Sequence, residues 1–197
     1  MLLDFIKLGI KTLLRNICEK ITIQSIEIIN NYKNFSKEIY KLNIKAENII
    51  FNKINIRKLN INAEDLILKL ELKKNPLIIE GLNAEITIQL TTDNINKTLS
   101  NKKWNSLKQS IESFLLNENI SHLDINNKLI YFISKNGNRI DNSGCYLKFY
   151  KSRILLVKID NNKELPIFND ENISIKKLQI IKDNIELHLN SKISFNS

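Results

Sequence analysis

The residues that could support hydrolytic chemistry lie around Ser143-Gly144-Cys145. A serine hydrolase needs a nucleophile on a tight turn, with a histidine and a carboxylate close to it, and a GxSxG sequence often carries that nucleophile. The chain contains no GxSxG, and its four glycines are scattered. We therefore interpret Ser143-Gly144-Cys145 as a turn.

Metal chemistry would need clustered ligands, and the sequence keeps them apart. The two histidines, His122 and His188, each lie alone on a strand-like segment, and Cys18 and Cys145 are far from one another. Neither cysteine has a CxxC or other zinc-ligand spacing, and unpaired cysteines fit a reducing compartment. We expect no metal and no cofactor.

Carboxylate pairs give no better support for catalysis. Glu64-Asp65 and Asp170-Glu171 are adjacent, so on a strand their side chains would point to opposite faces. Four glycines and two prolines leave little material for phosphate-binding loops or strained catalytic turns. The sequence predicts a protein that is not an enzyme.

The net charge of +9 raises the alternative of a basic structural or nucleic-acid-binding module. The excess is +6 over residues 1–60 and +4 over residues 119–197, while residues 61–118 carry −1. Basic runs never exceed two residues, and aromatic residues make up only 7% of the chain. The best aromatic and basic cluster reads as a strand with Tyr146, Lys148 and Tyr150 on one face and Leu147, Phe149 and Lys151 on the other. We expect no nucleic-acid partner.

Residues 1–20 have the spacing of an amphipathic helix. Its apolar face consists of Leu3, Ile6, Ile10, Leu13, Leu14 and Ile17, extended by Phe5 and Leu8. Lys7, Lys11 and Arg15 form a cationic stripe beside it, so the helix either lies on an anionic membrane, with Phe5, Lys7, Lys11 and Arg15 as the contacts, or packs on its own domain. Charges interrupt the apolar residues too often for a secretory signal or a transmembrane span, and we expect a cytoplasmic protein that is peripheral to the membrane.

From residue 21 the apolar period changes to two, which is typical of strands with one buried face in an antiparallel sheet. The clearest strands lie at residues 42–46, 54–56, 66–72 and 82–90. Residues 41–50 recur in similar form at 58–67, which indicates successive arms of a meander. Turns are predicted at Asn75-Pro76, at Asn136-Gly137 and at residues 141–144, 160–162 and 183–184.

One helical segment interrupts the strands, at about residues 92–117. Thr92 or Asp93 can cap its start. An apolar stripe follows at helical spacing, made of Trp104, Leu107, Ile111, Phe114 and Leu115. We therefore expect an α+β protein with about eight strands, in which residues 21–197 form a single domain after the N-terminal helix.

The stretch from Ile39 to Leu107 resembles a bacterial lipid-binding domain family of formerly unknown function that includes the mycobacterial lipomannan-elongation protein, and more closely the cyanobacterial branch of that family. The residues that carry the resemblance are the alternating run from Lys41 to Leu72, Asn75-Pro76, the strand Ile86-Thr87-Ile88-Gln89-Leu90-Thr91, and the helix start Thr92-Asp93-Asn94-Ile95-Asn96-Lys97-Thr98-Leu99. The resemblance extends over the chain after residue 20, and the family offers no catalytic residues to transfer.

The resemblance implies a tubular lipid-binding architecture, in which a strongly curved antiparallel β-sheet wraps around a helix and leaves an apolar groove for acyl chains. The implied function is non-catalytic binding, and transfer, of a membrane phospholipid or glycolipid. Alternating strands and one apolar helix can supply such a groove, because affinity there comes from removing acyl chains from water. The residues expected to contact lipid are Trp104, Leu107, Ile111, Phe114 and Leu115 from the helix, and Ile86, Ile88, Leu66 and Leu68 from the sheet.

Overall fold

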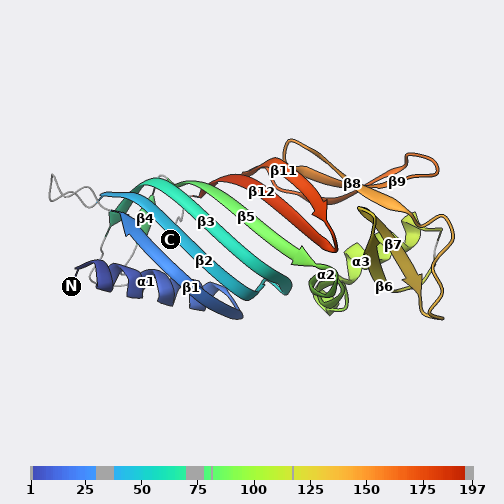
Figure 1. Ribbon diagram of the computed structural model, residues 1–197, viewed down its shortest axis with the longest axis horizontal. Coiled ribbons are helices and arrows are strands. Elements are labelled where there is room, and N and C mark those ends of the chain that lie inside the picture. Colours follow the sequence, from blue (N-terminus) through green and yellow to red (C-terminus); the bar gives the residue numbers. More distant parts are fainter. Residues whose placement is uncertain (1, 30–37, 70–77, 81, 117, 194–197) are drawn as a thin grey trace.

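The chain folds into two antiparallel sheets and a small set of helices (Figure 1). The computed structural model describes residues 2–29, 38–69, 78–80, 82–116 and 118–193, and for a few of these only the backbone. The helices are α1 (Leu2–Ile17), α2 (Thr92–Leu99), the 3-10 helix η1 (Lys102–Trp104) and α3 (Asn105–Phe114).

The large sheet has the strand order β1-β2-β3-β5-β12-β11, with the short strand β4 beside β3. The sheet combines strands from the first and the last parts of the sequence. Strand β5 pairs with β12 along its whole length. Everything from α2 to β10 is inserted between these two neighbours. The strands are β1 (Lys20–Ile29), β2 (Glu38–Phe51), β3 (Ile54–Lys69), β4 (Ile78–Glu80), β5 (Leu82–Thr91), β11 (Ile173–Ile181) and β12 (Asn184–Ile193).

The small sheet has the order β10-β9-β8-β7-β6 and is built entirely from that insertion. Pro166 lies in β10, an edge strand, where the missing N–H of proline costs no ladder hydrogen bond. The strands are β6 (Ile120–Asn126), β7 (Leu129–Ser134), β8 (Cys145–Tyr150), β9 (Arg153–Lys158) and β10 (Glu164–Asn169).

The large sheet has one apolar face, which we call the inner face, and one polar face, the outer face. The strand register produces the two faces, because it places apolar residues of neighbouring strands directly opposite one another. One inner row runs through Ile44, Ile61, Ile86 and Leu189. The neighbouring outer row runs through Asn43, Asn62, Glu85 and Asn190.

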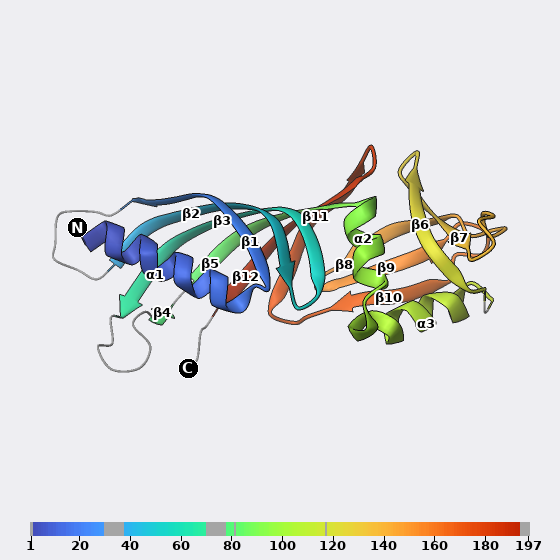
Figure 2. The same cartoon turned by 90° about the horizontal axis from the view of Figure 1, so that it is seen from below.

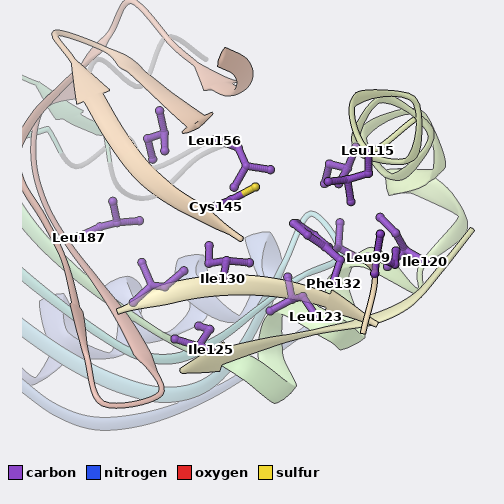
Figure 3. Close-up of a cluster of buried hydrophobic side chains, with 14 of the residues drawn as sticks. Leu99, Leu115, Ile120, Leu123, Ile125, Ile130, Phe132, Cys145, Leu156 and Leu187 are labelled. Carbon is purple, nitrogen blue, oxygen red and sulfur yellow. The ribbon is translucent and has the colours of Figure 1, made fainter. Parts of the chain in front are cut away.

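Two bodies cover the inner face. Helix α1 lies along the β1 to β5 part, where Ile6, Ile10 and Leu14 pack with Leu42 and Ile44 (Figure 2). The small sheet, together with α2 and α3, covers the β12 and β11 part. Figure 3 shows this second core, in which residues of both sheets and of the inserted helices meet, among them Leu99, Leu115, Phe132, Leu156 and Leu187.

Several sequence predictions are confirmed. The N-terminal helix, the strands at 42–46, 54–56 and 82–90, and the antiparallel α+β class are present. The repeated segments 41–50 and 58–67 fall in β2 and β3, which pair as a hairpin. Gly137 has φ +81°, in agreement with the turn expected at Asn136-Gly137. Residues 70–72 and the turn at Asn75-Pro76 lie outside the described residues.

Other predictions need correction. The described residues form twelve strands in two sheets rather than about eight, and α1 packs on the large sheet as well as the helices of the segment at 92–117. That segment is broken into α2, η1 and α3, because Ser100 ends α2 and the Asn101 side chain caps the next turn. The cap of α2 is Thr91, not Thr92 or Asp93, and it forms a reciprocal capping box with Asn94.

Candidate functional site

Helix α1 buries one face against the large sheet. Its side chains Ile6, Ile10 and Leu14 are 6%, 2% and 9% exposed, and they recur at the spacing that keeps them on one side of a helix. Asp4 in the first turn and Arg15 in the last turn complement the helix dipole. Of the two arrangements expected for this helix, packing on its own domain is therefore present.

The opposite face of α1 is also partly apolar. Phe5 is 56% exposed and Leu8 is 60% exposed, so neither extends the buried face as the sequence analysis expected. Both lie more than 100° around the helix from Ile10, because each residue turns the chain by about 100°. Lys7 and Arg15 are exposed and Lys11 is half-buried, so a cationic stripe lies beside this outward apolar pair.

The middle of the inner face lies between α1 and the second core. It consists of two directly opposed pairs, Leu59 with Ile88 and Ile61 with Ile86. We call these four residues the central patch. All four side chains are half-buried, whereas Ile44, beside α1, is only 5% exposed, and Leu189, in the second core, is 6% exposed.

The central patch connects three buried clusters. Ile61 packs against the α1 core, Ile88 packs against the second core, and Ile86 packs against both. Leu59 and Ile88 also pack against a small third cluster, made of Ala46, Ile49 and Ile56. Ile86 and Ile88 were expected to contact lipid, but Leu59 and Ile61 were not, since only the β3–β5 register brings them together. The similarity between segments 41–50 and 58–67 gave a partial signal, because it marks residues 58–67 as a strand with the same inward positions.

The apolar stripe expected on the inserted helix enters the second core. Ile111 and Leu115 are 5% and 2% exposed, and Leu107 and Phe114 pack beside them as half-buried residues. Trp104 is half-buried at the end of η1, and its Nε1 has no hydrogen-bond partner. The structure thus brings Leu107, Ile111, Phe114 and Leu115 into the core that Ile86 and Ile88 also contact. Leu66 and Leu68 lie in β3, and their side chains lie outside the described part of the chain.

A hollow of about 650 Å³ is lined mainly by residues of the outer face. Its walls carry three carboxylates and a single ammonium group, and Lys41 Nζ lies 3.5 Å from Glu64 Oε1. A surface of this polarity does not suit an acyl chain. The other lining residues are Asn62, Asn83, Ala84, Glu85, Glu171, Asn172, Ile173, Ser174, Asn190 and Ser191.

A polar network on the outer face has the residue types of a catalytic relay. His188 Nδ1 lies 3.4 Å from Thr87 Oγ1, and His188 Nε2 lies 2.7 Å from Glu186 Oε1, which also accepts a hydrogen bond from Gln179. The hydrogen bond from His188, followed by the one from Gln179, lowers the pKa of Glu186. Sequence reasoning missed this network because the β5–β12 register creates it.

This network lacks the other requirements of a nucleophilic site. Thr87 lies in β5, between β3 and β12, so the ladders on both sides use its backbone groups and the neighbouring N–H groups are not free to stabilise an oxyanion. The side chains stand on a sheet face rather than on a tight turn. We interpret the network as a polar contact that joins β5, β12 and β11.

The strand expected from Tyr146 to Lys151 is present as β8, but Lys151 lies in the following turn at φ 53°. Lys148 is paired with Glu164 at 2.8 Å, and Lys151 lies over the Tyr150 ring at 5.3 Å. Two of the cations that a nucleic-acid-binding strand would use to contact phosphates are therefore engaged in contacts within the protein.

Comparison of the chain with models of protein families gave no match, and neither curated proteins nor solved structures matched it. No helix in the described part of the chain is long and apolar enough to cross a membrane. Within the same part, no three His, Cys, Asp or Glu side chains come together as metal ligands.

Proposed function

We propose that this protein binds a membrane phospholipid or glycolipid without catalysis, with an acyl chain lying along the central patch and α1 resting on an anionic membrane surface at the cytoplasmic side. The observation that carries the proposal is the central patch itself. Its four apolar side chains are half-buried, whereas Ile44 and Leu189, at the two ends of the row that contains Ile61 and Ile86, are almost fully buried.

An acyl chain fits this position on energetic grounds. Each methylene removed from water contributes about 0.8 kcal/mol, so covering a half-buried row of isoleucine and leucine stabilises both the protein surface and the lipid tail. No nucleophile is needed. The resemblance of residues 39–107 to the bacterial lipid-binding family supports the same function.

The outward face of α1 supports the membrane part of the proposal. Phe5 and Leu8 are exposed beside Lys7 and Arg15, and aromatic and aliphatic side chains next to cations are typical of helices that lie in an anionic interface. Each Lys or Arg near such a surface contributes about 1 kcal/mol. Transfer of lipid between membranes would use the same patch.

The test is to extract the purified protein, identify copurifying lipids by mass spectrometry, and measure binding of a fluorescent phospholipid. The variant Ile86→Asn places an amide on the central patch, and the milder Ile86→Ala removes part of the apolar surface. Both should bind the probe more weakly. Ile181→Asn is the matched control, because Ile181 is 46% exposed at the end of β11, away from the patch.

Circular dichroism establishes that each variant is folded before binding is compared. If no lipid copurifies and the wild-type protein does not bind the probe, the proposal is wrong. Equal binding by folded Ile86→Asn and Ile181→Asn variants would also contradict it. Salt-dependent binding of random single-stranded oligonucleotides, without lipid binding, would favour the alternative of a nucleic-acid-binding module.

A further inference from the structure

The β2–β3 hairpin ends in an exposed aromatic residue. Phe51 is 45% exposed and is followed by Asn52 and Lys53, which have φ values of 52° and 65° and close a tight turn. Ile49 and Ile54 both belong to the inner face, because they pack in one cluster with Ala46 and Leu59; Asn48, at φ 52°, interrupts the alternation of β2 between Ala46 and Ile49. Because side chains alternate along a strand, Phe51 points to the same side as Ile49, which is the side that α1 covers.

This tip, formed by Phe51, Asn52 and Lys53, is fastened to Glu19, in the connection between α1 and β1. Glu19 donates its backbone N–H to the Ile50 carbonyl oxygen at 2.8 Å, and its carboxylate accepts the backbone N–H of Lys53 at 3.0 Å. The Lys53 ammonium also contacts that carboxylate, and these contacts lower the pKa of Glu19. The tip is therefore held beside the residues that follow α1.

The tip is also fastened to the inserted helices. Asn55 donates its backbone N–H to Thr98 Oγ1 of α2 at 3.0 Å, and the Lys103 ammonium of η1 bonds to Asn52 Oδ1. Figures 1 and 2 agree that α1, the end of this hairpin and α2 lie along the same side of the molecule. Phe51 thus lies close to helices that are far from it in sequence.

Exposed cations surround the exposed apolar residues at this end. Ile17, the last residue of α1, is 43% exposed. Lys20 is exposed, as are Lys102 and Lys103 of η1, while Lys53 is paired with Glu19. An apolar protrusion ringed by cations complements an anionic bilayer, in which a phenyl ring enters the interface and ammonium groups meet headgroup phosphates.

We infer that the tip of the β2–β3 hairpin is a second membrane anchor, which acts together with the outward face of α1 on one anionic bilayer surface. The inference rests on the proposed function, since it adds a second contact to the same peripheral protein. Two fixed contacts set the orientation of the molecule, so that the inner face, with the central patch, lies on the membrane side. If α1 were the single contact, the molecule would be free to rotate about the axis of this helix on the membrane surface.

The experiment measures flotation of the full chain with two kinds of vesicle, phosphatidylcholine alone and phosphatidylcholine mixed with phosphatidylglycerol. The test variants are Phe51→Ser and the double variant Lys102→Glu, Lys103→Glu. Matched controls are Phe149→Ser, at a residue 37% exposed on the small sheet, and Lys128→Glu, at the turn between β6 and β7. Thermal unfolding establishes that every variant is folded.

We expect Phe51→Ser to reduce binding to the anionic vesicles several-fold, and the double variant to reduce it by more than ten-fold, because each cation near the surface changes the partition coefficient about five-fold. The controls should bind as the wild type does. Equal binding by folded Phe51→Ser, by the double variant and by the controls would overturn the inference.

A separate assay keeps this result distinct from the proposed function. Binding of a fluorescent phospholipid monomer in vesicle-free buffer reports the central patch alone, and Phe51→Ser should leave it unchanged. Normal monomer binding with unaltered flotation would refute the second anchor while leaving lipid binding intact. Absence of monomer binding by the wild type would instead refute the proposed function, whatever the flotation shows.

Discussion

The side-chain amide of Asn96 pairs with the backbone of Leu123 as a neighbouring strand would. Its Nδ2 donates to the Leu123 carbonyl oxygen at 2.9 Å, and its Oδ1 accepts the Leu123 N–H at 2.8 Å. Asn96 lies in α2 and Leu123 in β6, one of the two edge strands of the small sheet. The edge of a sheet presents backbone N–H and C=O groups without a neighbouring strand. Here one side chain of a helix forms hydrogen bonds with both backbone groups of an edge residue.

Replacing this amide should loosen the small sheet. We expect Asn96→Ala to lower the free energy of unfolding by about 2 kcal/mol, because two hydrogen bonds are lost and the backbone of a buried residue is left without them. Urea denaturation measures the change. Asn105→Ala, at an exposed position of α3, is the control and should be close to neutral. A loss no larger than that of the control would contradict the structural role of Asn96.

The cationic stripe of α1 can be tested apart from the hairpin tip. A triple variant in which Lys7, Lys11 and Arg15 become Glu should float poorly with phosphatidylglycerol vesicles, because it reverses attraction to the anionic surface. The loss should shrink at high salt, since ions screen exposed charges. Flotation equal to that of the wild type at low salt would show that α1 makes no membrane contact.

Glu186 should make stability depend on pH. Its pKa is lowered from the ordinary value of 4.5, first by the hydrogen bond from His188 and then by the one from Gln179. A carboxyl group with a lowered pKa in the folded state stabilises the protein fully above its unfolded pKa, and this stabilisation is lost as the pH falls through the folded pKa.

Urea denaturation of the wild type and of Glu186→Gln at several pH values measures this contribution. The wild type should be the more stable at neutral pH, and the difference should diminish in acid. Gln179→Ala, which removes only the second hydrogen bond, should give an intermediate profile. A difference that stays constant over the whole acid range would exclude Glu186 as the source.

The two cysteines should differ in reactivity. Burial raises the pKa of the Cys145 thiol to about 12, and burial also raises the pKa of Cys18, which is only half-buried. Since the thiolate is the reactive form, iodoacetamide should label Cys18 slowly and Cys145 only after unfolding. Peptide mass spectrometry after timed labelling distinguishes them, with labelling in urea as the reference. Fast labelling of Cys145 in the native protein would mean that the second core opens readily.

Lys158 offers a test of a buried charge. Its side chain is 5% exposed, and its ammonium lies 3.3 Å from the carboxylate of Asp160, which is 35% exposed. Asp160→Asn should lower the free energy of unfolding by about 2 kcal/mol, because the buried ammonium loses its counter-charge. The double variant Lys158→Met, Asp160→Asn should regain part of that stability in the same urea assay. No recovery in the double variant would show that the loss has another cause.

Local patterns made part of this fold predictable. The alternation in residues 82–90 identified β5, and the spacing of Ile6, Ile10 and Leu14 identified α1. Both patterns are local, because the geometry of a single strand or helix sets the period of its buried residues. The turn at Gly137 followed from Asn-Gly chemistry. The break at Asn101 was readable in principle, since asparagine is a favoured helix cap, but the apolar stripe from Trp104 onward obscured it.

Long-range register was not predictable from the sequence. The pairing of β5 with β12, which joins residues about a hundred positions apart, creates both the second core and the contact between Thr87 and His188. The residues of the central patch likewise include some that the sequence predicted and some that it did not. Ile86 and Ile88 were expected to face inward from their alternation, but their partners Leu59 and Ile61 depend on which strands pair.

The insertion between β5 and β12 also affects how the protein is made. Strands β1, β2, β3 and β5 can pair in the order in which they leave the ribosome, but β5 cannot gain its second neighbour until β12, the most C-terminal strand, has been synthesised. During that interval the nascent chain presents an open β5 edge that carries Ile86 and Ile88. Exposed edges of this kind promote association between unfinished chains. Translation that stops before Asn184 should therefore yield aggregates rather than a smaller folded protein.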